Sequence, residues 1–307
     1  MTSSVVTTVF LPITVAVIML GLGLSLTVGD FTRVARQPRA AVIALACQVL
    51  VLPALCLGLV LLFDLAPLLA VGMMLLAASP GGTTANIFSH LARGDVALNI
   101  SLTAINSVLA VVTLPIVVNL ALAVFLDDGG SADQAIGLQP AKMAQVVAIV
   151  LVPVAIGMWI RARYAGFAER MRRPVRAASI VVLVAVIGVA MFQERANIGG
   201  FLEQVGVVAL LLSVLSLAIG YAVPRLSRVS HRQAIASSFE IGIHNATLAI
   251  TIALSPALLN NSTMAIPAAV YGVVMFLPAG ALCWYFARYR ARETLVSSQT
   301  GVSTSDT

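Results

Sequence analysis

One acidic residue stands inside an otherwise apolar stretch, with two polar side chains close behind it. Glu240 lies among small and apolar residues, and His244 and Asn245 follow on its C-terminal side. An ionisable side chain within a membrane segment is costly, so it is by default a candidate functional group. A carboxylate can hold a cation, and an imidazole can carry a proton. The other acidic residues fit loops, segment ends or the C-terminal tail, which leaves Glu240 as the first candidate.

A second polar stretch interrupts a different apolar segment. Residues 79–86 read Ser-Pro-Gly-Gly-Thr-Thr-Ala-Asn. Pro-Gly-Gly cannot continue a helix, because proline lacks an N–H donor and glycine favours non-helical backbone. Thr83, Thr84 and Asn86 then open a second half-helix, whose first turn has free N–H groups and a positive dipole end. Such an end can bind a substrate carboxylate. A proline kink stabilised by threonine caps is an equally acceptable interpretation.

A third polar set lies on the next apolar segment. Asn99, Thr103 and Asn106 are spaced so that they share one face of a helix. Taken singly, such side chains most often form hydrogen bonds between helices. Together with Asn86 and Glu240, they supply the hard oxygen ligands that suit a hard cation such as sodium.

The composition indicates an all-α integral membrane protein. Of the 307 residues, 60% are hydrophobic and only 10% are charged, whereas soluble domains carry about 25% charged residues. The net charge of +6 does not indicate nucleic-acid binding, because the basic residues lie in short loops between apolar runs. The three cysteines lie in apolar runs and are interpreted as small buried hydrophobes.

The apolar runs predict nine transmembrane helices, since a spanning helix needs about 20 such residues. The third and eighth are interrupted, at residues 79–86 and near Gly242. Broken backbone at membrane depth is tolerated only where protein or a watery cavity satisfies it, and paired breaks indicate the binding site of a secondary transporter. The nine predicted segments are 9–28, 40–63, 66–92, 96–125, 144–161, 175–193, 205–223, 233–255 and 265–287.

The basic residues predict the orientation in the membrane. All but Lys142 and Arg195 fall in alternate connections or in the C-terminal tail. The positive-inside rule therefore places the N-terminus outside and the C-terminus in the cytoplasm. The first apolar run lacks a basic leader and a cleavage site, so we expect a retained span. Residues 1–292 are expected to form one transporter domain, and the polar residues 293–307 a disordered cytoplasmic tail.

Three motifs resemble the bile acid:sodium symporter family. They are residues 79–86, the sequence Leu-Ala-Arg-Gly-Asp-Val-Ala-Leu at 91–98, and Glu-Ile-Gly-Ile-His-Asn at 240–245. The resemblance runs from about Pro12 to about Ala287. It implies the nine-span form of the family, with an inverted-repeat-like arrangement in which two broken helices cross near the sodium sites. It also implies a panel domain of spans 9–28, 144–161 and 175–193, and a core domain of spans 40–63, 66–92, 96–125, 205–223, 233–255 and 265–287.

The resemblance implies two sodium sites and a nearby substrate site. The first sodium site would use Asn86, Asn99, Thr103 and Glu240. The second sodium site would use Gln48, Glu240, His244 and the backbone of Ile241 and Ile243. The substrate would bind near Thr83, Thr84 and Asn245. The chain departs from the family pattern where Ala85 replaces a serine and His244 replaces a glutamine. Imidazole nitrogen is a poorer sodium ligand than an amide oxygen. Either the second site keeps its backbone ligands, or coupling is partly proton-dependent.

These observations predict a secondary active transporter that carries a small organic anion with sodium by alternating access. A bound sodium ion would offset the cost of keeping Glu240 ionised. The anion would be bile-acid-like or a small carboxylate such as pantoate or pyruvate, and the membrane a bacterial inner membrane. No cofactor is expected besides sodium as the coupling ion. The alternatives are proton-coupled or uncoupled anion transport through Glu240 and His244, a channel, or an intramembrane enzyme. An enzyme is disfavoured because no H-E-x-x-H pattern occurs.

Overall fold

The computed structural model describes residues 38–126, 140–171, 198–255 and 258–300, with scattered positions between 16 and 29 and between 174 and 181. Within these residues, all regular elements are helices apart from one isolated β-bridge. The all-helical prediction is therefore confirmed. More than half of the predicted span 9–28 and nearly all of the predicted span 175–193 lie outside the described residues.

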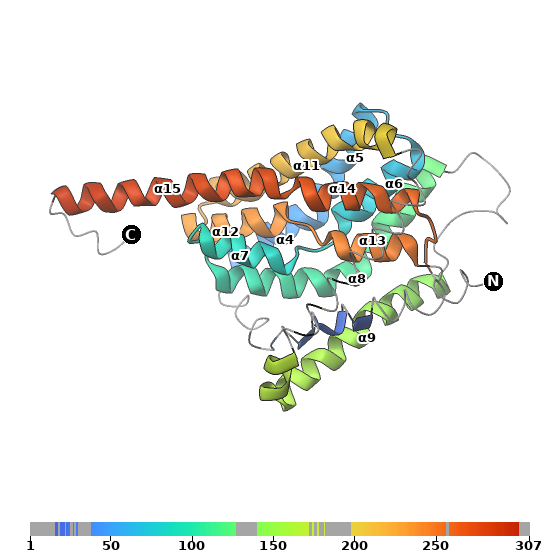
Figure 1. The fold of residues 1–307 in the computed structure, drawn as a ribbon, viewed down its shortest axis with the longest axis horizontal. Coiled ribbons are helices and arrows are strands. Elements are labelled where there is room, and N and C mark those ends of the chain that lie inside the picture. The colour runs from blue at the N-terminus through green and yellow to red at the C-terminus, as the bar shows by residue number, and fades with distance from the viewer. Residues whose placement is uncertain are drawn as a thin grey trace.

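The helices pack side by side into a bundle, and α15 extends beyond one end of it (Figure 1). Along the chain the helices are α4 (Pro38–Ala46), the π-helix η2 (Cys47–Val51), α5 (Leu52–Leu62), α6 (Pro67–Ala78), α7 (Thr83–Leu91), α8 (Val96–Leu126), α9 (Pro140–Arg163), α11 (Ile198–Leu226), α12 (His231–Gly242), α13 (Ala246–Leu254), the 3₁₀-helix η3 (Thr263–Ala265), α14 (Ile266–Val274) and α15 (Phe276–Thr300).

Three continuous helical stretches within the described residues are long and apolar enough to cross a membrane. They are Pro38–Leu62, Glu203–Leu226 and Thr263–Arg288, and the bent helix α8 makes a fourth if its two parts count as one span. The bend in α8 is 54° and lies between Ala110 and Val112. Pro115 accounts for it, because proline offers no N–H to the carbonyl four residues before it. Nine spans stay a prediction.

Helix α15 runs past the residue at which a disordered tail is expected to begin. A disordered tail was expected from residue 293, but α15 continues through Thr300, and only residues 301–307 lie outside the described part. The reason is local: Glu293 and Leu295 are good helix formers, and neither proline nor glycine follows before Gly301. A helix also satisfies its own backbone hydrogen bonds, so it can continue beyond the apolar segment.

The two predicted interruptions are present. The third predicted segment divides into α6, which ends at Ala78, and α7, which begins at Thr83. The eighth divides into α12, which ends at Gly242, and α13, which begins at Ala246. Each half-helix contacts one half-helix of the other pair, since α7 packs against α12 and α6 against α13. The two broken helices therefore cross.

Backbone hydrogen bonds join the two breaks where they cross. The Gly82 N–H donates to the Ile243 carbonyl at 3.0 Å, and the Asn245 N–H donates to the Pro80 carbonyl at 2.8 Å. These bonds flank the isolated antiparallel bridge of the structure. A broken helix leaves unpaired N–H and C=O groups, which are costly away from water. Each break thus satisfies groups that the other leaves free.

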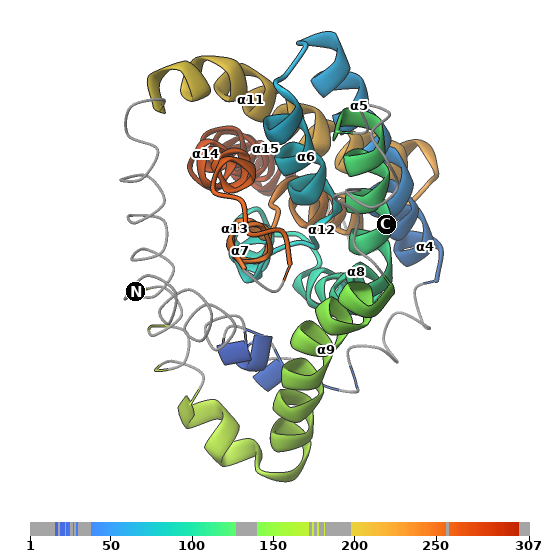
Figure 2. The same ribbon diagram turned by 90° about the vertical axis from the view of Figure 1, so that its right-hand side faces the viewer.

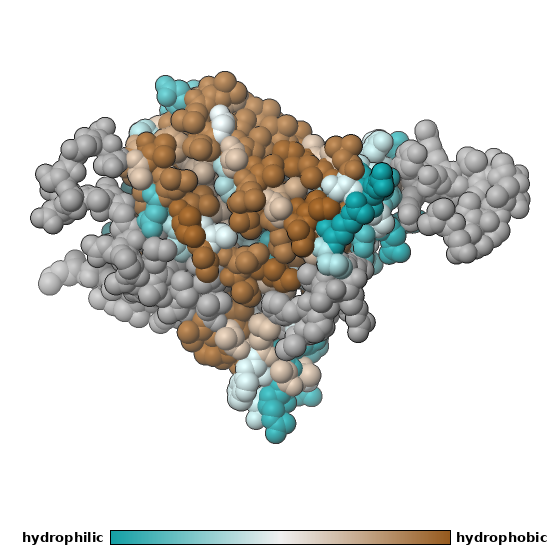
Figure 3. Space-filling model, turned by 180° about the vertical axis from the view of Figure 1, so that it is seen from behind, coloured by the Kyte–Doolittle hydropathy of each residue, from teal (hydrophilic) through white to brown (hydrophobic). Residues whose placement is uncertain are grey.

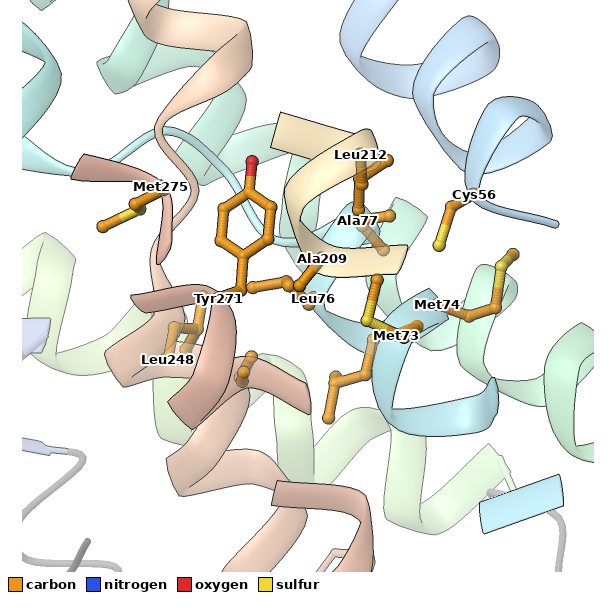
Figure 4. Close-up of a cluster of buried hydrophobic side chains, with 14 of the residues drawn as sticks. Cys56, Met73, Met74, Leu76, Ala77, Ala209, Leu212, Leu248, Tyr271 and Met275 are labelled. Carbon is orange, nitrogen blue, oxygen red and sulfur yellow. The ribbon is translucent and has the colours of Figure 1, made fainter. Parts of the chain in front are cut away.

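Apolar side chains fill the space between the crossed helices and their neighbours. Figure 4 shows Tyr271 of α14 beside Leu76 of α6, Ala209 of α11 and Leu248 of α13. All four are almost fully buried. The core thus holds α6, α11, α13 and α14 together and encloses the region where the breaks cross.

Apolar side chains also cover much of the outer surface. Figure 3 shows hydrophobic residues across most of the described part of one face. Large exposed examples are Leu50, Leu62, Ile116 and Leu277. Contiguous apolar surface of this extent marks contact with another apolar phase rather than with water. A surrounding bilayer supplies that phase.

Helix α9 lies to one side of the crossed helices, beside the described residues near the N-terminus (Figure 2). Small residues allow the close approach: a side chain at Gly157 would collide with the Leu20 carbonyl, and one at Gly23 with the Val154 backbone. Close packing through small residues is typical of membrane helices. The assignment of α9 and its neighbour to a separate panel domain stays a prediction.

Candidate cation site at the crossed breaks

Glu240 lies on α12, just before the break, and is only 1% exposed. The Thr103 hydroxyl donates to its Oε2 at 2.5 Å, and the Asn106 amide Nδ2 donates to its Oε1 at 3.1 Å. Both donors belong to α8, one turn apart, so this helix orients the carboxylate. Within the described residues no Lys or Arg pairs with Glu240. A buried carboxylate without a cationic partner is a place where a bound cation would lower the free energy.

The first break approaches this carboxylate closely. The Gly81 backbone lies directly beside the Glu240 carboxylate. A Cβ atom at Gly81 would collide with the Glu240 side chain, whereas one at Gly82 would lie 3.7 Å from the nearest atom, the His244 carbonyl oxygen. Glycine at position 81 is therefore what permits the break to reach the carboxylate.

Side-chain amides around the breaks share one feature: their oxygens are buried and accept no hydrogen bond from the described residues. These oxygens are Gln48 Oε1, Asn86 Oδ1, Asn99 Oδ1 and Asn106 Oδ1. A buried acceptor without a donor costs about 1–3 kcal/mol. Amide oxygens are hard ligands, and a hard cation such as sodium would supply the missing partner.

The predicted ligands of the first sodium site are only partly joined by contacts. Asn99 Nδ2 donates to the Ala236 carbonyl at 2.7 Å, which holds α8 against α12. The Thr103 hydroxyl, which binds Glu240, also lies 3.0 Å from the Asn99 carbonyl. Asn86 lies on α7, which packs against both α8 and α12. No hydrogen bond within the described residues joins the Asn86 side chain to Glu240.

Gln48, a predicted ligand of the second site, reaches the first break from another helix. It lies in the π-helix η2, and its Nε2 donates to the Ser79 carbonyl at 3.1 Å. Short π-helical turns occur frequently at functional sites. The hydrogen bond fixes the amide nitrogen and leaves Oε1 free. Gln48 makes no hydrogen bond to Glu240 or His244 within the described part of the chain.

His244 is buried beside Tyr271, a residue that the sequence analysis did not single out. His244 Nδ1 lies 3.0 Å from the Tyr271 hydroxyl, and that hydroxyl donates to the Gly242 carbonyl at 3.0 Å. Since a tyrosine hydroxyl has one proton, Nδ1 must carry a proton and donate it to the tyrosine oxygen. His244 Nε2 is then an unprotonated acceptor, and no described donor reaches it. Because a buried tyrosine hydroxyl needs a hydrogen-bond partner, a tyrosine within an apolar segment was the sequence feature that could have indicated this contact.

The predicted backbone ligands sit at the end of α12. Ile241 is the last residue but one of this helix, and the Ile243 carbonyl, beyond its end, accepts from the Gly82 N–H. A carbonyl oxygen has two lone pairs, so Ile243 can still bind a cation.

The predicted substrate residues flank the starts of α7 and α13. Asn245 caps α13, since its Oδ1 accepts from the Leu248 N–H at 3.1 Å. No side chain caps α7, whose N-cap position is Gly82. Thr84 is partly buried in the first turn of α7, while the Thr83 side chain lies outside the described residues. The free N–H groups of α7 can therefore bind an anion.

Comparison with known proteins gives one family and several relatives. Residues 12–201 match the model described as the sodium bile acid symporter family. The chain is 24% identical to the uncharacterized sodium-dependent transporter YocS of Bacillus subtilis over 299 residues, which cover 96% of this chain and 88% of that protein. It is 26% identical to the human ileal sodium/bile acid cotransporter over 251 residues, covering 81% and 70%. It is 28% identical over 258 residues to a probable chloroplastic sodium/metabolite cotransporter of Arabidopsis thaliana, covering 83% and 61%.

Proposed function

Because this chain belongs to the sodium bile acid symporter family, we propose that it couples sodium entry to the uptake of a small organic anion. Family membership confirms the predicted resemblance and makes the chain a multi-pass membrane transporter rather than an enzyme. The observation that carries the proposal is the Glu240 carboxylate, buried without a cationic partner near amide oxygens that lack donors.

The first sodium ion would bind between α7, α8 and α12. Asn99 and Thr103 support this assignment, because the Thr103 hydroxyl lies close to the Asn99 carbonyl and donates to Glu240. The free oxygens of Asn86 and Asn99 would complete the set. The second ion would use Gln48, Glu240, the Ile241 and Ile243 carbonyls and His244 Nε2.

The substrate would bind where the breaks cross. The uncapped start of α7 offers N–H groups to a carboxylate or sulfonate, and Thr83, Thr84 and Asn245 would line this place. The relatives bear names that mention bile acids or metabolites. We therefore propose a bile-acid-like anion or a small carboxylate such as pantoate or pyruvate as substrate.

Sodium and substrate would be coupled through the crossed breaks. A sodium ion at Glu240 would tie α8 to both breaks, because the carboxylate contacts Thr103, Asn106 and Gly81. A firmly held crossing keeps the start of α7 in place for the anion. Each ligand then binds better to the state that the other stabilises, so the coupling is reciprocal. Core and panel helices would rock against each other to expose the site alternately.

The replacement Glu240→Ala tests the proposal. In proteoliposomes, we expect it to abolish anion uptake driven by a sodium gradient, because the cation site loses its only charge. The matched control is Ser238→Ala on the same helix, whose hydroxyl donates to the Leu217 carbonyl and not to Glu240. It should retain sodium-driven uptake. Equal sodium-driven uptake by Glu240→Ala and the wild type would refute the role of this carboxylate.

The same assay examines the proton-coupled alternative, which one observation favours. His244 Nε2 is a buried acceptor without a described donor, as a proton-binding group would be. Uptake driven by a pH gradient in potassium alone, and lost in His244→Gln, would replace the sodium-coupled proposal.

A further inference from the structure

A surface pocket lies at one end of the bundle, where the turn between α7 and α8 meets the start of α12. Its volume is about 530 Å³, within the range of about 300–1,000 Å³ that is typical of small-molecule sites. The charged or titratable side chains that line it are His90, Arg93, Asp95 and Arg232. None of the predicted sodium or substrate residues is among the described residues that line it, so the pocket is separate from the crossed breaks.

Backbone contacts hold the two sides of this pocket together. Helices α7 and α12 pack against each other (Figure 1), and the Asp95 N–H donates to the Arg232 carbonyl at 2.9 Å. Gly94 allows this approach, because a Cβ atom there would collide with the Ile235 side chain of α12. Arg93 and Arg232, far apart in the sequence, therefore face one pocket from two half-helices that belong to different breaks.

The pocket carries an excess of positive charge. Arg93 and Arg232 are both exposed, and neither forms an ion pair with any described carboxylate. Of the described residues that line the pocket, only Asp95 is acidic, and its Oδ1 accepts from the Leu98 N–H at 3.0 Å, at the start of α8. Two guanidinium groups beside one carboxylate favour a bound anion. Guanidinium groups offer paired N–H donors that match phosphate oxygens, so a phosphate group suits this pair of arginines.

Exposed apolar side chains border the pocket. Ile87 and Leu91 of α7 are 45% and 56% exposed. Residues three or four apart on a helix are neighbours, so Ile87 shares a face with both His90 and Leu91. A free phosphate ion makes no favourable contact with such a surface. A phospholipid combines an anionic phosphate with acyl chains and matches both the basic pocket and its apolar border.

We propose that Arg93 and Arg232 bind the phosphate group of an anionic phospholipid. Basic pockets between membrane helices bind phospholipid head groups in this way. The inference goes beyond the proposed function, because it does not depend on which ion or substrate is carried. A phosphate held by both arginines ties α7 to α12, one half-helix from each break, so the bound lipid stabilises the crossed arrangement.

Lipid binding to the purified protein in detergent tests this inference. Native mass spectrometry measures the dissociation constant of phosphatidylglycerol for wild type, Arg93→Gln and Arg232→Gln, with zwitterionic phosphatidylcholine as the reference lipid. We expect wild type to prefer phosphatidylglycerol. Each variant should bind phosphatidylglycerol about tenfold more weakly, because a charge-assisted hydrogen bond is lost, and phosphatidylcholine as wild type does. Equal affinity of wild type for the two lipids would overturn the proposal.

Arg228→Gln is the matched control. Arg228 is exposed in the turn between α11 and α12, and its φ of 57° is close to the 58° of Arg93. The two substitutions therefore remove the same charge from similar backbone. Because Arg228 does not line the pocket, its variant should bind phosphatidylglycerol as tightly as wild type. An equal loss of affinity in Arg228→Gln would show that general surface charge attracts the lipid, and the proposed pocket would be wrong.

Thermal unfolding distinguishes a lipid from a soluble phosphate compound as the ligand. Phosphatidylglycerol should raise the unfolding temperature of wild type, and raise it much less in Arg93→Gln and Arg232→Gln. Glycerol phosphate at the same concentration and ionic strength should leave wild type unchanged. Stabilisation by glycerol phosphate as large as that by the lipid would identify a soluble ligand and overturn the lipid assignment. Without added lipid, all variants should unfold at the wild-type temperature, which establishes that they are folded; if Arg232→Gln does not fold, Arg93→Gln decides the question.

Discussion

At the scale of single residues, Tyr271 links the broken helix to its histidine. The break in α12 leaves the Gly242 carbonyl without a helical donor, since the Ala246 N–H binds the His244 carbonyl instead. The Tyr271 hydroxyl donates to Gly242 and accepts from His244 Nδ1. It therefore fixes both the shape of the break and the tautomer of the imidazole. Partners of this kind orient metal ligands without touching the ion.

Removing this single hydroxyl should weaken sodium binding. In Tyr271→Phe, His244 is free to adopt either tautomer, and we expect the sodium dissociation constant to rise by about tenfold. Isothermal titration with sodium measures the affinity, and ¹⁵N NMR of the imidazole should show a mixture of tautomers.

The same substitution made in a His244→Gln protein shows whether Tyr271 acts by orienting His244 or only by packing. In the His244→Gln variant, Tyr271→Phe should have a smaller effect on sodium affinity, because no imidazole remains to be oriented. An equal loss of affinity in both backgrounds would mean that Tyr271 acts through the Gly242 carbonyl alone.

At the scale of helices, the crossing of the two broken helices depends more on Gly81 than on Gly82. A Cβ atom at Gly81 would collide with the Glu240 carboxylate, while Gly82 has an ordinary contact distance of 3.7 Å and a φ of −93° that other residues adopt. Overpacking of this kind costs about 1–3 kcal/mol. The two glycines are therefore a matched pair for testing whether the break must approach the carboxylate.

We expect Gly81→Ala to lose stabilisation by sodium and Gly82→Ala to keep it. Thermal unfolding in sodium, compared with potassium at the same ionic strength, measures the ion-specific effect for both variants and wild type. A wild-type sodium effect in Gly81→Ala would show that close approach of the break is not needed for cation binding.

The helix breaks were predictable from sequence, but the contacts around them were only partly so. Pro80 and the glycines after it end a helix by their covalent chemistry, whatever surrounds them. The hydrogen bond from Asn106 to Glu240 depends instead on how α8 is rotated against α12, which residues far apart in the chain decide. The sequence spacing predicted that Asn106 shares a helix face with Asn99 and Thr103, but it did not indicate that Asn106 would donate a hydrogen bond to Glu240.

At the scale of the whole molecule, basic residues gather at one end of the bundle. Arg93 lies in the turn between α7 and α8, and Arg232 lies in the first turn of α12. The Asp95 N–H donates to the Arg232 carbonyl at 2.9 Å, so these two regions are adjacent. Figure 1 shows the extended end of α15 on the same side, while the turn between α5 and α6 lies on the opposite side. The positive-inside rule predicts that the arginine end is cytoplasmic.

Accessibility of single cysteines tests this orientation. The native Cys47, Cys56 and Cys283 are buried and can be replaced by alanine. One new cysteine then replaces Ala66 before α6 or Ser227 after α11, both small residues at opposite ends of the bundle. If the predicted orientation is right, a membrane-impermeant maleimide should label Ala66→Cys in intact cells, because that turn would then face outward. Ser227→Cys should be labelled only after the membrane is permeabilised.

The permeabilised sample is the internal control, since both cysteines should react there if both turns are accessible. The opposite pattern in intact cells would place the arginine end outside. Sodium driven by its gradient would then approach the crossed breaks from the arginine end, where the positive charge of the arginines repels it. The expected orientation avoids that barrier and presents Asp64, in the α5–α6 turn, on the side from which sodium arrives.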